Sequence, residues 1–182
     1  GFAADEDSYT PDISHDGNLV CFTSQAENLV TSAALDKAFE QVFLRDRTAG
    51  TTVLVSHEPG GERGNMAAFV PRLSGNGAKV VFVSESTDLV AADTNVHEDA
   101  FVYDVATEVV SRLSTGPNGE ANRSSVRVDI SADAAYAVFS TSATNLENPA
   151  IGGVRNIYRK RLSNGALVRC SVKLGGGEPD DD

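Results

Sequence analysis

The sequence predicts an all-β fold built from a repeated unit, and three observations lead to that prediction. Equivalent serines at Ser14, Ser74 and Ser131 recur at intervals of 60 and 57 residues within segments that align with one another. Short apolar stretches of strand length alternate with clusters of turn residues along the 182-residue chain. No region shows a sustained helical period. Internal repeats of this kind indicate a fold made of stacked identical units.

Each repeat is predicted to contain four short antiparallel strands. The first strand leads into the repeated serine, and tight turns follow at Asp16-Gly17 and Asn76-Gly77. The third and fourth strands are QVFLRD and TVLVS in the first copy, AFVYD and VSRLS in the second, and NIYRKR and VRCS in the third. The second strand is a nearly continuous apolar run, typical of a strand that is buried on both faces. It contains a phenylalanine that we expect at an equivalent buried site in every copy: Phe22, Phe82 and Phe139.

The first turn of the third repeat departs from this pattern. Asp133-Ala134 stands where the other copies have a glycine. Glycine adopts positive φ angles at little cost and alanine does not. We therefore expect this turn to be strained or differently shaped.

Four antiparallel strands that recur at just under 60 residues are typical of a β-propeller blade. A single blade cannot bury both of its faces, so neighbouring blades must stack around an axis. The sequence predicts one propeller domain over residues 1–182, with repeats at about 1–57, 58–115 and 116–174. An acidic, glycine-rich tail follows at 175–182.

Several positions together give the repeat a family resemblance. They are the serine, the Asp-Gly turn, the apolar strand that ends in Phe-Thr-Ser, the following Asn-Leu, and the segment DTNVHEDAFVYD at Asp93–Asp104. This pattern resembles the TolB-type propeller repeat, which is WD-like. The resemblance implies a non-enzymatic scaffold or protein-interaction module in an extracytoplasmic location, either periplasmic or secreted. Because one propeller fold hosts many activities, two alternatives stay open. One is a polysaccharide lyase or hydrolase with its site in the central channel, and the other is a carbohydrate-binding propeller.

Three blades do not close a ring, so the sequence predicts a partial propeller. Both ends of the chain fall at the same point of the repeat, because Pro11 aligns with Pro71 and Gly175–Gly177 stand at the place of Gly60-Gly61. Each end blade would then expose an apolar face. We expect another protein to cover these faces. It would be either the rest of a longer chain or a second copy, since two copies would give six blades with twofold symmetry.

Charge and hydropathy restrict the partners. The chain has 15 basic and 26 acidic residues, and the net charge is −11. An acidic surface repels phosphate backbones, so we expect no nucleic-acid partner. No apolar run approaches the roughly 20 residues of a membrane-spanning helix. Cys21 and Cys170 lie in apolar stretches, where free cysteines are commonly buried, and a disulfide or a reactive thiol is the alternative.

The sequence offers no catalytic or cofactor-binding motif. His15, His57 and His97 stand in different contexts, and neither HExxH nor GxSxG occurs. An enzyme of this fold would need histidine, arginine and carboxylate groups brought together from several blades. Sugar binding usually employs aromatic side chains, but the chain has four tyrosines and no tryptophan. We therefore predict no catalytic residue.

One loop has the composition of a calcium site. Asp93, Asn95 and Asp99 alternate with other residues and offer oxygen ligands, which Ca²⁺ prefers. The sixth position of this loop is Glu98 rather than the glycine of an EF-hand. The alternative interpretation is a polar loop in which Asp93 caps a turn. Calcium is the one cofactor that the sequence suggests.

The third repeat carries a run of basic residues. Five of the 15 cations lie there, at Arg155, Arg159, Lys160, Arg161 and Arg169. They form either a solvated strand face at the edge of the array or a basic patch. A patch would meet an acidic surface, such as the chain's own segment EPDDD at 178–182 or a partner.

Overall fold

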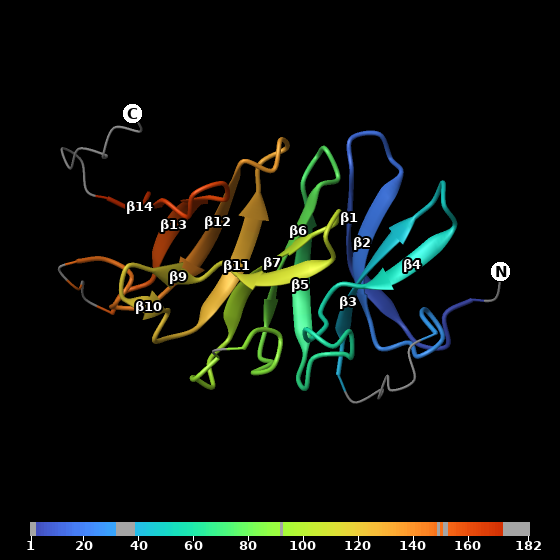
Figure 1. Ribbon diagram of the computed structural model, residues 1–182, viewed down its shortest axis with the longest axis horizontal. Helices are drawn as coiled ribbons and strands as arrows, with labels where there is room; N and C mark the ends of the chain where they lie inside the picture. Colours follow the sequence, from blue (N-terminus) through green and yellow to red (C-terminus); the bar gives the residue numbers. More distant parts are fainter. Residues whose placement is uncertain (1–2, 32–38, 92, 149, 151–152, 173–182) are drawn as a thin grey trace.

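Three four-stranded antiparallel sheets stand side by side in the computed structural model (Figure 1). The structure describes residues 3–31, 39–91, 93–148, 150 and 153–172, and the predicted tail at 175–182 lies outside these ranges. Blade 1 consists of β1 (Ser8–Ile13), β2 (Leu19–Ser24), β3 (Gln41–Asp46) and β4 (Thr51–Leu54). Blade 2 consists of β5 (Ala68–Leu73), β6 (Lys79–Ser84), β7 (Asp99–Asp104) and β8 (Val109–Arg112). Blade 3 consists of β11 (Ser125–Ile130), β12 (Tyr136–Thr141), β13 (Asn156–Arg161) and β14 (Leu167–Arg169).

A short hairpin joins blade 2 to blade 3. It pairs β9 (Thr115–Gly116) with β10 (Gly119–Glu120). In each blade the four strands pair in chain order, and β5 lies against both β1 and β11. The described ranges contain strands and loops without a helix, so none of their segments is a helix that could span a membrane. The prediction of an all-β partial propeller is confirmed.

The repeated serine at the end of each first strand fixes the turn that follows it. The Ser14 hydroxyl accepts a hydrogen bond from the backbone N–H of Leu19 at 3.0 Å and donates one to Asp16 at 2.6 Å. Ser74 and Ser131 make the same two bonds in their own turns. The serine therefore recurs because it pairs groups that the turn would otherwise leave unpaired.

The glycine of this turn has a positive φ, as its dipeptide predicts. The angle is 71° at Gly17 and 72° at Gly77. Ala134 has a φ of 60° at the equivalent position, and its N–H bonds to the carbonyl of Ser131 at 2.9 Å. The third turn thus keeps the shape of the others and contains a strained alanine.

Two apolar cores lie between the three blades. The first contains Cys21 and Leu44 of blade 1 together with Phe82 and Phe101 of blade 2. The second contains Val81, Val83 and Ala100 of blade 2 and the pair Phe139–Tyr158 of blade 3. Blades 2 and 3 therefore each pack an aromatic pair on the preceding blade, and blade 2 packs smaller aliphatic side chains on blade 3. The rings are stacked with centroids 5.6 Å apart in Phe82–Phe101 and 5.8 Å apart in Phe139–Tyr158.

The two outward faces of the array lack such a neighbour among the described residues. Phe82 and Phe139 are fully buried, whereas Phe22 is only half-buried and Ile13 beside it is 54% exposed. On the far face of blade 3, Ile157 is 42% exposed. The expectation of three equally buried phenylalanines is confirmed at Phe82 and Phe139 and wrong at Phe22, because no blade of the described ranges packs on it.

The two cysteines also differ in burial. Cys21 lies in the first core and is fully buried, as expected, and burial raises the pKa of its thiol to about 12. Cys170 follows β14, the outermost strand of blade 3, and is exposed. Its expected burial is wrong because it lies beyond the last packed strand.

Backbone hydrogen bonds join the turns of neighbouring blades. The N–H of His15 donates to the carbonyl of Gly75 at 2.8 Å, and the N–H of Asn76 donates to the carbonyl of Ala132 at 2.8 Å. The imidazole of His15 lies so close to Gly75 that a Cβ there would be 2.6 Å from Nε2. Main-chain contacts thus add to the apolar cores in holding successive blades together.

Candidate functional site

A large hollow lies where blade 2 meets blade 3. It has a volume of about 900 Å³. The loop between β6 and β7, the end of β8, the β9–β10 hairpin and the loop after β12 form its walls. Its lining includes a buried arginine, a glutamate, an exposed histidine and four amide side chains: Arg112, Glu120, His97, Asn95, Asn118, Asn122 and Asn145.

Arg112 lies among three carboxylates at the base of this hollow. Its guanidinium is 2.8 Å from Asp93 and 3.6 Å from Asp99, and it also contacts Glu120. The side chain of Arg112 is 6% exposed, and those of Asp93 and Asp99 are 2% and 0% exposed. Because the guanidinium supplies one positive charge against three negative charges, the cluster is acidic overall. We call these four residues the Arg112 cluster.

Short hydrogen bonds hold the carboxylates in place. The hydroxyl of Ser114 donates to Asp99 at 2.5 Å, and the amide of Asn95 donates to the other oxygen at 3.2 Å. Burial raises the pKa of Asp99, and the bonds from Ser114 and the charge of Arg112 oppose that effect. The backbone N–H of Thr94 donates to Glu120 at 3.3 Å. The cluster thus ties the β6–β7 loop to β8 and to the hairpin.

The serine contact belongs to the repeat. At the end of each fourth strand a serine hydroxyl donates to the side-chain oxygen of the residue that opens the third strand: Ser56 to Gln41 at 2.7 Å, Ser114 to Asp99, and Ser171 to Asn156 at 2.8 Å. Blade 2 alone has a carboxylate at this position. The arginine is not unique, since Arg169 of blade 3 lies 3.2 Å from Glu147, but blade 1 has Leu54 at the equivalent site.

The structure brings Asp93, Asn95 and Asp99 together, as the calcium prediction requires. Carboxylate oxygens of Asp93, Asp99 and Glu120 all lie within 4.8 Å of one another. The side-chain oxygen of Asn95 instead accepts the backbone N–H of His97 at 2.6 Å. An ion would have to compete with Arg112 for all three carboxylates. Calcium binding here therefore stays a prediction.

Sequence reasoning missed Glu120 and Arg112. The dipeptide Asn118-Gly119 is a hairpin signal, and it would have placed β10 and its glutamate next to β9. No local pattern marks Arg112, because the loop it contacts is distant in sequence.

The cluster is not where the enzyme alternative would place a site. The first strands β1, β5 and β11 lie together, as strands that line a propeller axis do. Arg112 belongs to β8, the fourth strand of its blade, and Glu120 belongs to the connecting hairpin. The arginine of the hollow therefore comes from the fourth strand of its blade, whereas Asn122 of the lining lies three residues before β11.

No protein-family model and no curated protein matches the sequence. Solved propellers do match in structure. TolB from Acinetobacter baumannii aligns with a TM-score of 0.54 and 18% identity, over 92% of this chain and 33% of its own. The putative TolB from Agrobacterium tumefaciens aligns with a TM-score of 0.58 and 21% identity, over 95% of this chain and 49% of its own. The β-propeller domain of the Trilobed protease from Pyrococcus furiosus aligns with a TM-score of 0.53 and 12% identity, over 89% of this chain and 41% of its own.

These likenesses are low in identity and show the fold. The chain spans between about a third and a half of the TolB chains that it matches. Peptidase structures occur among the matches as well as TolB, so the matches alone do not select a function. The chain is a partial propeller with a TolB-type β-propeller-like fold.

Proposed function

We propose that the chain is a non-enzymatic protein-interaction module or scaffold whose two end faces are covered by other protein. The observation that carries this proposal is the contrast between Phe22 and its equivalents. Phe82 and Phe139 are fully buried because a preceding blade packs on each of them, and Phe22 is half-buried with Ile13 exposed beside it. An exposed apolar face such as that of blade 1 usually marks an interaction site. The likeness to TolB supports the further proposal of an extracytoplasmic location.

A second copy of this chain is the less favourable occupant. Between blades 2 and 3, Val102 and Asp104 line one small cavity with Leu162. The strand pairing places Arg159 and Arg161 at the positions of Val102 and Asp104, and Arg47 at that of Leu162. A ring of two copies would therefore bring cations of blade 3 against a cation of blade 1. Like charges across an interface oppose association, so we favour a different polypeptide, either more of a longer chain or another protein.

The solution behaviour of two variants tests the proposal. We expect the chain to bind an environment-sensitive apolar dye, and we expect Ile13→Asp to reduce that binding several-fold. Val96→Asp is the matched control, because Val96 is 89% exposed in a loop away from the end faces. Sedimentation over a hundredfold concentration range gives the mass in parallel. A 19.1 kDa monomer that binds no dye and does not respond to Ile13→Asp would contradict the proposal.

A further inference from the structure

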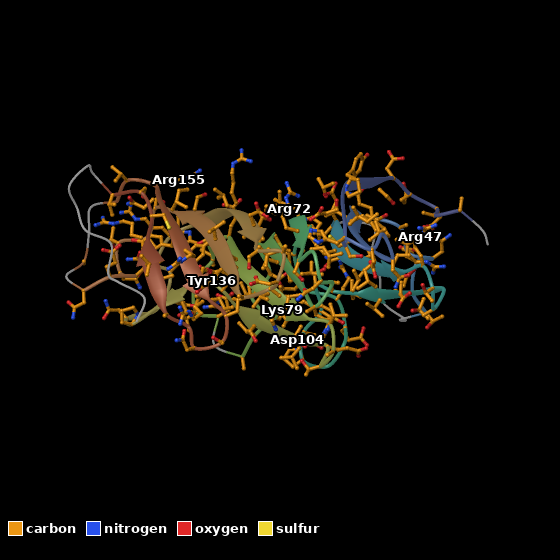
Figure 2. All side chains as sticks on the ribbon, turned by 90° about the horizontal axis from the view of Figure 1, so that it is seen from above. Arg47, Arg72, Lys79, Asp104, Tyr136 and Arg155 are labelled. Atoms are coloured by element: carbon orange, nitrogen blue, oxygen red, sulfur yellow. The ribbon has the colours of Figure 1, made fainter. Side chains whose placement is uncertain are left out.

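The outer face of blade 3 differs in chemistry from the equivalent faces of blades 1 and 2, each of which is buried against the next blade. We call it the arginine face and define it by Arg127, Tyr136, Val138, Ile157, Arg159 and Arg161. Figure 2 shows Tyr136, together with Arg155, at the blade 3 end of the molecule. Asp129 of β11 lies at its inner edge. Its side chains are exposed or half-buried.

The run of basic residues divides between the two sides of β13. Tyr158 and Lys160 face blade 2, where Tyr158 is fully buried and Lys160 donates to the carbonyl of Leu113 at 2.9 Å. Because side chains alternate along a strand, Ile157, Arg159 and Arg161 lie on the opposite side. Arg169 is separate, since it pairs with Glu147. The arginine face therefore contains only some of the basic residues of the third repeat.

The strand register shows what these arginines replace. Arg159 occupies the position of Leu44 in blade 1 and Val102 in blade 2, and Arg161 occupies that of Asp46 and Asp104. Blade 3 thus has an arginine at one position that is aliphatic in the other two blades and at one position that is a carboxylate in them. A covering surface that carries negative charge therefore suits this face better than the aliphatic face of an ordinary blade does.

Tyr136 holds both guanidinium groups in position. The guanidinium carbon of Arg159 lies 4.7 Å from the centre of the Tyr136 ring, and that of Arg161 lies 5.5 Å from it. Arg161 also donates to the tyrosine hydroxyl at 3.0 Å. Guanidinium groups that are already oriented lose little freedom when they bind carboxylates.

Two shallow hollows lie on the same face. One of about 310 Å³ is lined by Arg127, Val138, Arg155 and Ile157. The other, of about 300 Å³, is lined by Ile130, Tyr136 and Arg159. Asp129 lines both hollows as well, so each combines apolar walls and one carboxylate with at least one guanidinium. The guanidinium groups suit short acidic side chains on a polypeptide.

We propose that the arginine face binds the chain's own acidic segment, Glu178-Pro179-Asp180-Asp181-Asp182. This segment has four carboxylates in five residues, against the guanidinium groups of Arg127, Arg155, Arg159 and Arg161. The inference rests on the proposed function, because the segment would occupy one of the two end faces in the absence of the other protein. A partner for that face would then have to displace the segment.

The length of the connection permits this contact. β14 ends at Arg169, and eight residues, Cys170 to Gly177, separate it from Glu178. Such a stretch spans up to roughly 26 Å when it is extended. The centre of the face lies two strands away from β14, which is about 10 Å. Tethering also raises the effective concentration of the segment to the millimolar range, so individually weak charge pairs suffice.

Methyl and aromatic NMR signals of the full chain test the proposal. One variant neutralises the segment by Glu178→Gln, Asp180→Asn, Asp181→Asn and Asp182→Asn, and a second variant carries Arg159→Gln and Arg161→Gln. We expect neutralising the segment to shift the signals of Val138, Ile157 and Tyr136 in wild type. In the arginine variant the same neutralisation should cause less than a third of that shift. Arg47→Gln is the matched control, because Arg47 is an exposed arginine of blade 1, and the full shift is expected in its background.

The dependence of the same NMR signals on salt and on protein concentration distinguishes the acidic segment from other occupants of the face. We expect 0.5 M NaCl to reproduce the shift in the wild-type chain, and the signals to be independent of protein concentration. Unchanged signals in the neutralised chain, or shifts of equal size in the arginine background, would overturn the proposal. Shifts that depend on protein concentration would assign the arginine face to a second copy of the chain, and this result would also overturn the proposal. The proposed function has its own readout at Ile13, so the two can fail separately.

Discussion

Lys160 of blade 3 reaches across the interface to the backbone of blade 2, where its ammonium group donates to the carbonyl oxygen of Leu113 at 2.9 Å. The same group donates to the carbonyl of Thr115 at 3.0 Å and contacts the Thr115 hydroxyl. Burial lowers the pKa of Lys160 to about 8. A charged group inside the interface therefore links the stability of the blade 2–3 contact to pH.

We predict that stability rises with pH between about 8 and 9.5 because of Lys160. The unfolded chain holds the lysine proton up to its ordinary pKa of 10.5, whereas the folded chain releases it from about 8. The unfolded state thus binds more protons in this range, and raising the pH favours the folded state. Cys21, whose pKa is raised, acts in the opposite direction above pH 9. Urea denaturation of wild type and Lys160→Met isolates the effect, and equal pH slopes in the two proteins would contradict it.

We predict opposite effects of exchanging glycine and alanine at equivalent turns. Ala134→Gly relieves a φ of 60° and should stabilise the chain by about 0.5 kcal/mol, since the strain outweighs the added chain entropy. Gly77→Ala should destabilise it by more than about 1 kcal/mol. Its Cβ would need a φ of 72° and would lie 2.7 Å from Leu19 Cδ1. Thermal unfolding measures both changes, and destabilisation by Ala134→Gly would show that the alanine is not strained.

We predict that truncation of the three equivalent phenylalanines costs unequal free energy. Phe82→Ala and Phe139→Ala remove fully buried rings and should cost about 3–5 kcal/mol each. Phe22→Ala should cost about 1–2 kcal/mol, because its ring is half-buried. Urea denaturation of the isolated chain gives the three values. A cost at Phe22 as large as at Phe82 would mean that the blade 1 face is already covered in that sample.

We predict that calcium binds the Arg112 cluster more tightly when the arginine is removed. Arg112→Leu copies the residue of blade 1 and leaves three close carboxylates without their counter-charge, which should cost about 3–5 kcal/mol. Millimolar Ca²⁺ should then raise the melting temperature of the variant more than that of wild type. Calorimetric titration checks the binding, with Asp93→Asn in the variant as the control. Absence of heat and of any melting shift in both proteins would remove the calcium prediction.

The repeated positions carried most of the information about the fold. Ser14 and its equivalents mark a local hydrogen-bonded turn, and a pattern set by neighbours in sequence is readable from sequence. Burial at a repeated position was less readable. Phe22 and Phe82 have the same local pattern, but their burial depends on whether a blade precedes them.

The candidate site was predicted in part for the same reason. Asp93, Asn95 and Asp99 lie within one loop, so their proximity follows from spacing. Arg112 and Glu120 join them through strand pairing and an added hairpin, which spacing alone does not encode. Glu120 had a usable signal in Asn118-Gly119, whereas Arg112 had none.

The bonds between neighbouring turns bear on how such an array could grow by duplication. Main-chain groups make them, so a copied unit would bring the contact with it whatever its side chains. The His15 ring limits that freedom, because a Cβ at position 75 would lie 2.6 Å from it. Ala132 occupies the equivalent position of the third unit. If the third unit were moved directly behind the first, its alanine would meet the imidazole. Exchange of the second and third units would therefore require the His15 ring to move, although the folds of the two units are the same.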